Sequence, residues 1–219
     1  MLYDAPADPY KKISLRPNNI EYRISHYNGE IVVPSAKSKG LGRVRGGEWD
    51  LPKHRTKVQD VEKINYFSQR FEKDLDRQET AYYHWIYEKQ EEKGWYKKNG
   101  FKSIEKYVEQ RLENYEELYH EIKEMGYREN HEGQSFVPGH SQPIKDRLEV
   151  EIFIGRDGKI YLHDGQHRFG IARTLDLEIP AHVVCRHKKW QQTRDNIFNN
   201  GLMEEYKNLE DHPDLQDII

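Results

Sequence analysis

The chain has 219 residues, of which 35% are apolar and 33% are charged, and its formal net charge at pH 7 is −3. Aromatic residues make up 12% of the chain, which argues against disorder because large rings build a core from few residues. The acidic net charge excludes the overall basic character typical of nucleic-acid-binding domains, although a local basic patch stays open.

The N-terminal stretch MLYDAPADPYKK contains no apolar segment, and apolar runs elsewhere extend over only a few residues. Neither a secretory signal nor a membrane span is therefore expected. The single cysteine, Cys185, excludes an intramolecular disulfide and suits a reducing compartment. We expect a cytoplasmic protein without a membrane partner, whose oligomeric state the sequence does not indicate.

Strands are expected on both sides of Asn28-Gly29, a hairpin-turn signal that follows an apolar alternation ending at Ile24. The stretch 34–56 is rich in Gly, Pro and basic residues, and we expect a long loop there.

Within this loop, GRVRGGEWD carries Arg43, Arg45 and Asp50. These residues are candidates for a clamp that completes a substrate site, because phosphoryl transfer depends on charge neutralisation. The alternative is an ordinary glycine-rich loop whose Trp49 packs on the core.

Helical spacing of apolar residues dominates the next part of the chain. Thr56 and Gln59 match a capping box, which predicts a helix from there to about Leu75. A second helix is expected over 77–93, and a third over 103–125, ended by a glycine.

Beyond a second loop, the pattern becomes that of alternating strands and helices. Val150, Ile152 and Ile154 are apolar residues at alternate positions, which predicts a strand. Asp157-Gly158 predicts a hairpin turn into a return strand. A third strand is expected over 179–184, and a last helix over about 187–200.

The stretch HDGQHRF places an unusual set of residues in one strand-to-helix turn: Asp164, Gly165, Gln166, His167 and Arg168. A helix N-terminus is a ready anion site, because its backbone N–H groups lack partners and carry a partial positive charge. The glycine allows close approach of a ligand, and an arginine offers a planar fork suited to phosphate oxygens. We therefore predict phosphate binding by Arg168, His167, Gln166 and the Gly165 amide.

Asp164 is the unexpected member of this set, because a lone carboxylate repels a phosphate. It is a candidate Mg²⁺ ligand, a candidate base for a hydroxyl, or a helix cap. In the simplest alternative it only caps the helix, Gly165 only turns the chain, and Arg168 pairs with nearby glutamates.

Two further groups of residues have competing interpretations. Glu149 and Glu151 share a strand face. They are candidates for binding Mg²⁺ or for accepting a proton from the substrate, and the alternative is that they simply face solvent. Segment 186–194 is basic and either contacts a nucleic-acid backbone or forms an exposed basic helix. The histidines near the turn do not have the spacing of a zinc site.

The stretch YLHDGQHRFGIARTLDLEIPAHVV resembles the signature of the ParB/sulfiredoxin superfamily, in which a strand, a G-x-[HR]-R turn, a helix and an "IP" strand recur. Three further stretches resemble the opening strand, the preceding helix and the hairpin of that core: ISLRPNNIEYRI, YEELYHEIKEMGY and LEVEIFIGRDGKIYL. The spelling DGQHR is also that of DGQHR-domain proteins, some of which are associated with DNA phosphorothioation.

This resemblance implies a nucleotide whose phosphates sit on the turn, as in sulfiredoxins, CTP-binding ParB clamps and free-serine kinases. Sulfiredoxins place their catalytic cysteine where this chain has Gln166, so the resemblance does not extend to their chemistry. ParB clamps usually have an acidic-Arg pair where this chain has Gln166 and His167. The free-serine kinases are similar in having Asp-Gly before a His-Arg pair, and they match the local chemistry best.

The expected fold is α/β (α+β), a single domain with a small mixed sheet of ParB/sulfiredoxin-like type. Its core is expected over 10–33 and 110–190, with a helical insertion over 56–109. The expected function is that of an ATP- or ADP-dependent kinase of a small hydroxyl-bearing molecule, with Mg²⁺ held by Asp164. Asp164, His167 and Arg168 are its candidate catalytic residues.

Alternatives are a DNA-associated module, either a nuclease or a nucleotide-gated regulator of DNA modification, and a nucleotide sensor without turnover. In each case, a nucleotide other than ATP or ADP is a further alternative.

Overall fold

The computed structural model describes residues 3–25, 41–128 and 150–219. The chain divides into two compact units. One, here the sheet unit, comprises residues 1–58, 149–165 and 178–219; the other, here the helical unit, comprises 59–148 and 166–177. The expected mixture of helices and a mixed sheet is confirmed.

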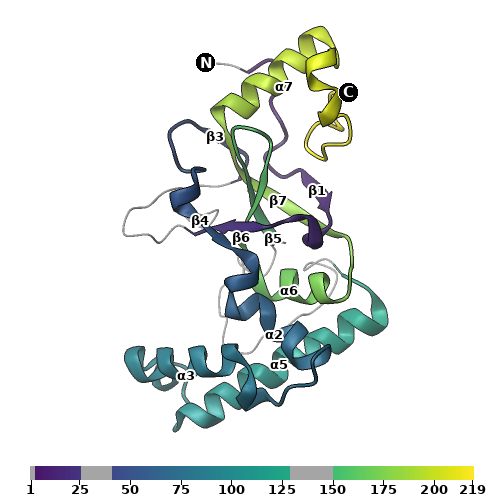
Figure 1. Cartoon of the computed structure of the whole chain (residues 1–219). Helices are drawn as coiled ribbons and strands as arrows, with labels where there is room; N and C mark the ends of the chain where they lie inside the picture. The colour runs from purple at the N-terminus through teal and green to yellow at the C-terminus, as the bar shows by residue number, and fades with distance from the viewer. Residues whose placement is uncertain (1–2, 26–40, 129–149) are drawn as a thin grey trace. The chain divides into compact units, whose positions relative to one another are not determined.

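Seven strands among the described residues form one sheet in the order β1-β7-β5-β6-β2-β4, with β3 also paired to β7 (Figure 1). The strands are β1 Lys12–Leu15, β2 Tyr22–Ile24, β3 Arg43–Arg45, β4 Arg55–Lys57, β5 Val150–Ile154, β6 Ile160–Asp164 and β7 Ile179–His187. Strand β7 is parallel to β5 and β3, while the β5–β6 and β1–β7 pairs are antiparallel. All residues of β5 are buried, as expected of a strand covered on both faces.

The expected hairpin over β5 and β6 is confirmed. Gly158 donates its N–H to the carbonyl oxygen of Gly155 at 3.1 Å, and Lys159 donates to Asp157 Oδ1 at the same distance. The third expected strand is also confirmed, and it extends beyond its predicted end to His187. The expected turn at Asn28-Gly29 lies outside the described residues.

The loop expected over 34–56 is wrong in part, because β3 and β4 form within and just beyond it. The capping box at Thr56 is also wrong. Thr56 is in β4, opposite Arg23 of β2, and the following α-helix begins only at Glu62. Sheet pairing thus takes precedence over the local capping signal.

The helical unit contains five α-helices among the described residues. They are α2 Glu62–Phe71, α3 Ala81–Lys93, α4 Trp95–Lys98, α5 Ile104–Met125 and α6 Gln166–Thr174. The predicted start of α5 is confirmed, since Ser103 Oγ accepts the N–H of Lys106 at 3.3 Å. Short 3-10 turns complete the two units, at Pro17–Asn19, Pro52–His54, Val58–Asp60, Arg77–Glu79 and Glu204–Leu209.

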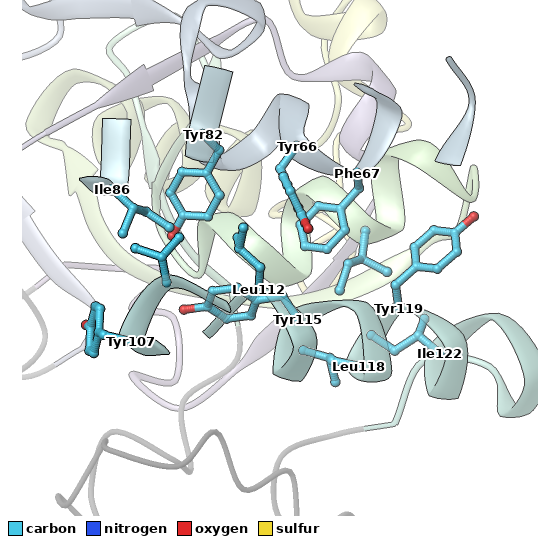
Figure 2. Packing of buried hydrophobic residues seen from close by; sticks show 12 residues of the cluster. Tyr66, Phe67, Tyr82, Ile86, Tyr107, Leu112, Tyr115, Leu118, Tyr119 and Ile122 are labelled. Carbon is cyan, nitrogen blue, oxygen red and sulfur yellow. The ribbon is translucent and has the colours of Figure 1, made fainter. Parts of the chain in front are cut away.

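A core of aromatic and aliphatic side chains holds the helical unit together (Figure 2). Its buried members are Tyr66, Phe67, Tyr82, Ile86, Tyr107, Val108, Leu112, Tyr115, Leu118, Tyr119, Ile122 and Ile171. Helix α6 approaches α2 closely at Gly170, where a Cβ atom would lie 2.6 Å from the carbonyl oxygen of Ile64. The helix that follows the DGQHR turn is therefore part of the helical unit.

The sheet unit ends in α7, Lys188–Asn200, and a C-terminal segment that binds back onto it. The buried carboxylate of Asp214 accepts bonds from Arg186 Nε at 2.9 Å and Trp190 Nε1 at 2.9 Å, and its backbone oxygen accepts a bond from Arg194. Arg186 and Arg194 are 1% and 0% exposed, so neither belongs to an exposed basic helix.

No helix among the described residues is long and apolar enough to cross a membrane.

Replacing Asp214 with Asn should destabilise the sheet unit by about 3–5 kcal/mol, because it leaves the buried guanidinium of Arg186 without its counter-charge, while Arg194 keeps Asp217. Burial alone raises the pKa of Asp214, but the bonds and charge of Arg186 outweigh burial and lower it. The contribution should thus be present at neutral pH and fade only as the pH falls below about 4.

The free energy of unfolding in urea measures this effect, with Asp211→Asn as the control on an exposed residue of the same segment. Equal stability of the two variants at neutral pH would contradict the assignment.

Candidate functional site

The backbone of the DGQHR turn depends on one glycine. Strand β6 ends at Asp164, Gly165 has a φ of +79°, and α6 begins at Gln166. A Cβ atom at Gly165 would lie 3.0 Å from Cα of Val150, so a side chain there meets both an unfavourable φ and a crowded backbone. The helix therefore starts directly after the strand.

The side chain of Asp164 forms a hydrogen bond within this turn. Its Oδ1 accepts the N–H of Gly165 at 2.9 Å, and the side chain is half-buried. The carboxylate thus bonds to the residue that precedes α6 and not to an N–H group of the helix, so this contact is not that of a helix cap. This bond does not exclude a second role, because a carboxylate can accept several hydrogen bonds.

His167 is held within the helical unit by two tyrosines. The Tyr82 hydroxyl of α3 lies 2.8 Å from Nε2 of His167, and the Tyr115 ring of α5 stacks on the imidazole with centroids 3.8 Å apart. Burial raises the pKa of both tyrosines above its usual range, so both hydroxyls keep their protons at neutral pH. The imidazole is therefore fixed in its plane by neutral groups.

Arg111 adds a positive charge to this group of side chains. Its Nη1 donates to the Tyr107 hydroxyl at 3.3 Å, and its guanidinium carbon lies 5.3 Å from the centroid of the Tyr115 ring. Burial raises the pKa of the Tyr82 hydroxyl, and this effect outweighs the charge of Arg111, which acts to lower that pKa.

Arg168 is directed to the end of α5. Its Nη1 donates to the backbone oxygen of Arg128 at 3.0 Å, and its guanidinium carbon lies 5.4 Å from the centroid of the Tyr127 ring. An arginine fork carries several N–H donors, so a bond to one carbonyl is compatible with phosphate binding. Gln166 is half-buried as the first residue of α6.

Glu151 lies beside the turn residue Asp164, its register partner across the β5–β6 pair. Its side chain is buried, and its Oε2 lies 3.9 Å from Nε2 of His163. Nδ1 of His163 must carry a proton, because it bonds to the carbonyl oxygen of Ile24 at 3.1 Å. The interpretation of Glu151 as solvent-facing is therefore wrong, while Glu149 lies outside the described residues.

Asp50 lies at the opposite end of the β5–β6 hairpin from Asp164. Its buried carboxylate accepts the backbone N–H of Arg156 at 2.8 Å and that residue's Nη2 at 2.7 Å. Burial alone raises the pKa of Asp50, but the bonds from Arg156 outweigh burial and lower it. These contacts give Asp50 a structural role at the hairpin turn.

Arg43 and Arg45 are also distant from Asp164 along the sheet. Strand β3 places them opposite Cys185 and His187 of β7, whereas the turn end of β5 lies opposite His182. Trp49 packs edge-on against Phe153, with centroids 5.6 Å apart, as the ordinary-loop alternative expected. The structure thus brings Glu151 to Asp164 but does not bring Arg43, Arg45 or Asp50 there.

In the described part of the chain, no group of three or more His, Cys, Asp or Glu side chains is arranged to hold a metal ion. Mg²⁺ in phosphate-binding sites commonly uses only one or two carboxylates, with phosphate oxygens and water as its other ligands. A single carboxylate such as Asp164 is therefore chemically compatible with Mg²⁺ only where phosphate oxygens and water supply the other ligands.

Sequence reasoning missed the residues that hold the candidate side chains: Tyr82, Tyr115 and Arg111 around His167, and Arg156 on Asp50. In the sequence the tyrosines occupy apolar positions of amphipathic helices, so the pattern indicates only that they are core residues.

Replacing Gly165 with Ala should destabilise the sheet unit by roughly 2–5 kcal/mol, from the unfavourable φ and from the contact with Val150. Gly94 is the control, because it is left-handed with a φ of +60° and a Cβ atom there meets nothing within 4 Å. Gly94→Ala should cost only about 1–2 kcal/mol. If urea unfolding gives equal losses for the two variants, the contact with Val150 has no energetic role.

Comparison with protein-family models, curated proteins and solved structures found no significant match to this chain.

Proposed function

We propose that the DGQHR turn binds the phosphates of a nucleotide, and that the protein is a nucleotide-dependent phosphotransferase acting on a small hydroxyl-bearing molecule. The observation that carries this proposal is the backbone of Gly165. Its positive φ starts α6 directly after β6, so the first backbone N–H groups of the helix follow a residue without a side chain. Such a turn suits close approach of an anion.

Two side chains in the first turn of α6 support the same chemistry. Arg168 supplies a guanidinium fork, and His167 supplies a ring whose orientation is fixed by Tyr82 and Tyr115. Electrostatic stabilisation and positioning supply most of the catalysis of phosphoryl transfer. The oriented ring of His167 and the guanidinium of Arg168, both near the N-terminus of α6, suit this positioning and charge stabilisation.

Asp164 is the proposed catalytic carboxylate. The acceptor oxygen would attack the terminal phosphorus, the shortened nucleotide would leave, and the hydroxyl proton would pass to the carboxylate. ATP or ADP is the proposed nucleotide, and Mg²⁺ would neutralise its phosphates beside Asp164. Glu151, the buried neighbour of Asp164, would raise the negative charge there and favour the cation.

The order of elements supports a ParB/sulfiredoxin-like type for this part of the fold. The β5–β6 hairpin leads through the turn into α6 and then into β7, which is parallel to β5. This order is the one that the resemblance in the sequence implies, and the assignment is part of the proposal.

The second candidate is a nucleotide sensor without turnover. The bond from the Gly165 N–H to Asp164 Oδ1 favours it, because a carboxylate that only stabilises the turn performs no chemistry. Both candidates require nucleotide binding at the same turn, so binding is tested first and the role of Asp164 second.

Nucleotide binding should raise the melting temperature by on the order of 5–10 °C when the ligand is present at about 100 times its Kd. The probes are ATP, ADP, CTP and GTP, each with Mg²⁺. Arg168→Ala should weaken binding about 10- to 100-fold through the loss of charge-assisted bonds. Arg16→Ala is the control, because it makes the same charge change at an exposed residue of the sheet unit. Unaltered binding by Arg168→Ala would refute the site, and no shift with any nucleotide would refute both candidates.

The variant Asp164→Asn distinguishes a kinase from a sensor. Its amide oxygen can still accept the Gly165 N–H, while the negative charge and the basic site are removed. In a kinase the rate of acceptor-dependent nucleotide consumption should fall by about 100-fold or more, with the fold and the melting temperature kept. Acceptor-dependent consumption that is unchanged in the variant would contradict a catalytic carboxylate.

A further inference from the structure

The helical unit holds His167 at two points of the imidazole ring. Tyr82 of α3 hydrogen-bonds to Nε2 at 2.8 Å, and Tyr115 of α5 covers one face with an interplanar angle of 16°. Tyr82 is 0% exposed and Tyr115 is 2% exposed, so both contacts lie away from solvent. Which ring nitrogen of His167 carries the proton depends on whether the Tyr82 hydroxyl donates to Nε2 or accepts from it.

Burial of Tyr82 decides how its hydroxyl is used. Its oxygen lies 2.8 Å from Nε2 of His167, which is the hydrogen-bond partner that the described residues offer to this hydroxyl. The hydroxyl hydrogen of Tyr82 must then point to an acceptor, because a buried O–H without one costs free energy. Nε2 of His167 is at hydrogen-bond distance and can be that acceptor.

The hydroxyl of Tyr115 is a competing acceptor, because the rings of Tyr82 and Tyr115 are neighbours, with centroids 6.4 Å apart. An imidazole nitrogen is the stronger base of the two, since imidazole binds a proton with a pKa near 6.5 and a phenolic oxygen is far less basic. The stronger base takes the hydrogen, so the Tyr82 hydrogen should go to Nε2.

We propose that Tyr82 is a positioning residue that fixes His167 as the tautomer with its proton on Nδ1, while Tyr115 fixes the plane of the ring. His167 is then a hydrogen-bond donor through Nδ1 and not a base through Nε2. This inference rests on the proposed function, in which His167 contributes a donor for phosphate oxygens. In this proposal, side chains of the helical unit keep His167 in one tautomer.

Nitrogen NMR measures the tautomer directly and needs no ligand. Long-range proton–nitrogen correlation spectra of the ¹⁵N-labelled full chain at neutral pH show which ring nitrogen is protonated, and a His167→Gln spectrum identifies the resonances. Nε2 of His167 should have the downfield shift of an unprotonated nitrogen. In Tyr82→Phe the ring should lose this preference and populate the Nε2–H tautomer.

Two variants control for indirect effects. Tyr83→Phe removes a hydroxyl from the neighbouring, half-buried position of α3 and should leave the His167 signals unchanged. Tyr115→Phe keeps the stacked ring and should keep the Nδ1–H tautomer. If wild-type His167 shows the Nε2–H tautomer, or if Tyr82→Phe leaves the tautomer unchanged, the proposal is wrong.

A binding measurement connects the tautomer to the turn. Tyr82→Phe should weaken binding of Mg-ATP or Mg-ADP by roughly two- to tenfold, and Tyr83→Phe should not. Unchanged affinity in Tyr82→Phe would refute the positioning role. If the wild type binds no nucleotide, the proposed function fails, and the spectra still decide the tautomer.

Discussion

The candidate site depends on one backbone constraint, which is that the chain leaves β6 through a residue where a side chain would be strained. Gly165 combines a φ of +79° with a distance of 3.0 Å between its would-be Cβ and Cα of Val150. Because the chain turns within this single residue, Gln166 is already helical and His167 and Arg168 lie in the first helical turn. The turn thus fixes where α6 begins, while Tyr82 and Tyr115 fix the direction of the His167 ring.

Buried carboxylates outside the turn bond to arginines: Asp50 to Arg156, Asp214 to Arg186, and Glu116 to Arg77 at 2.7 Å. In the turn, two tyrosines contact the ring of His167, and a backbone carbonyl oxygen accepts a bond from Arg168. These contacts fix the directions of the two side chains in the first turn of α6.

Local patterns in the sequence predict much of this fold and fail where distant residues decide the outcome. The β5–β6 hairpin and the start of α5 follow from a turn dipeptide and from Ser103, which act over a few residues. Thr56 has an equally good local signal but is in β4, because pairing with β2 competes with helix formation. The turn itself was predictable from HDGQHRF, whereas the Tyr82–His167 bond joins residues 85 positions apart and has no signature in the sequence.

The central claim, that phosphates bind at the N-terminus of α6, is tested most directly by backbone amide NMR during a titration with Mg-ADP. We expect the amide signals of residues 166–168 to shift most and to saturate together, since the first N–H groups of α6 would meet the phosphate oxygens, whereas the N–H of Gly165 is bonded to Asp164 Oδ1. Saturable binding that shifts other amides and leaves these three unchanged would contradict the claim.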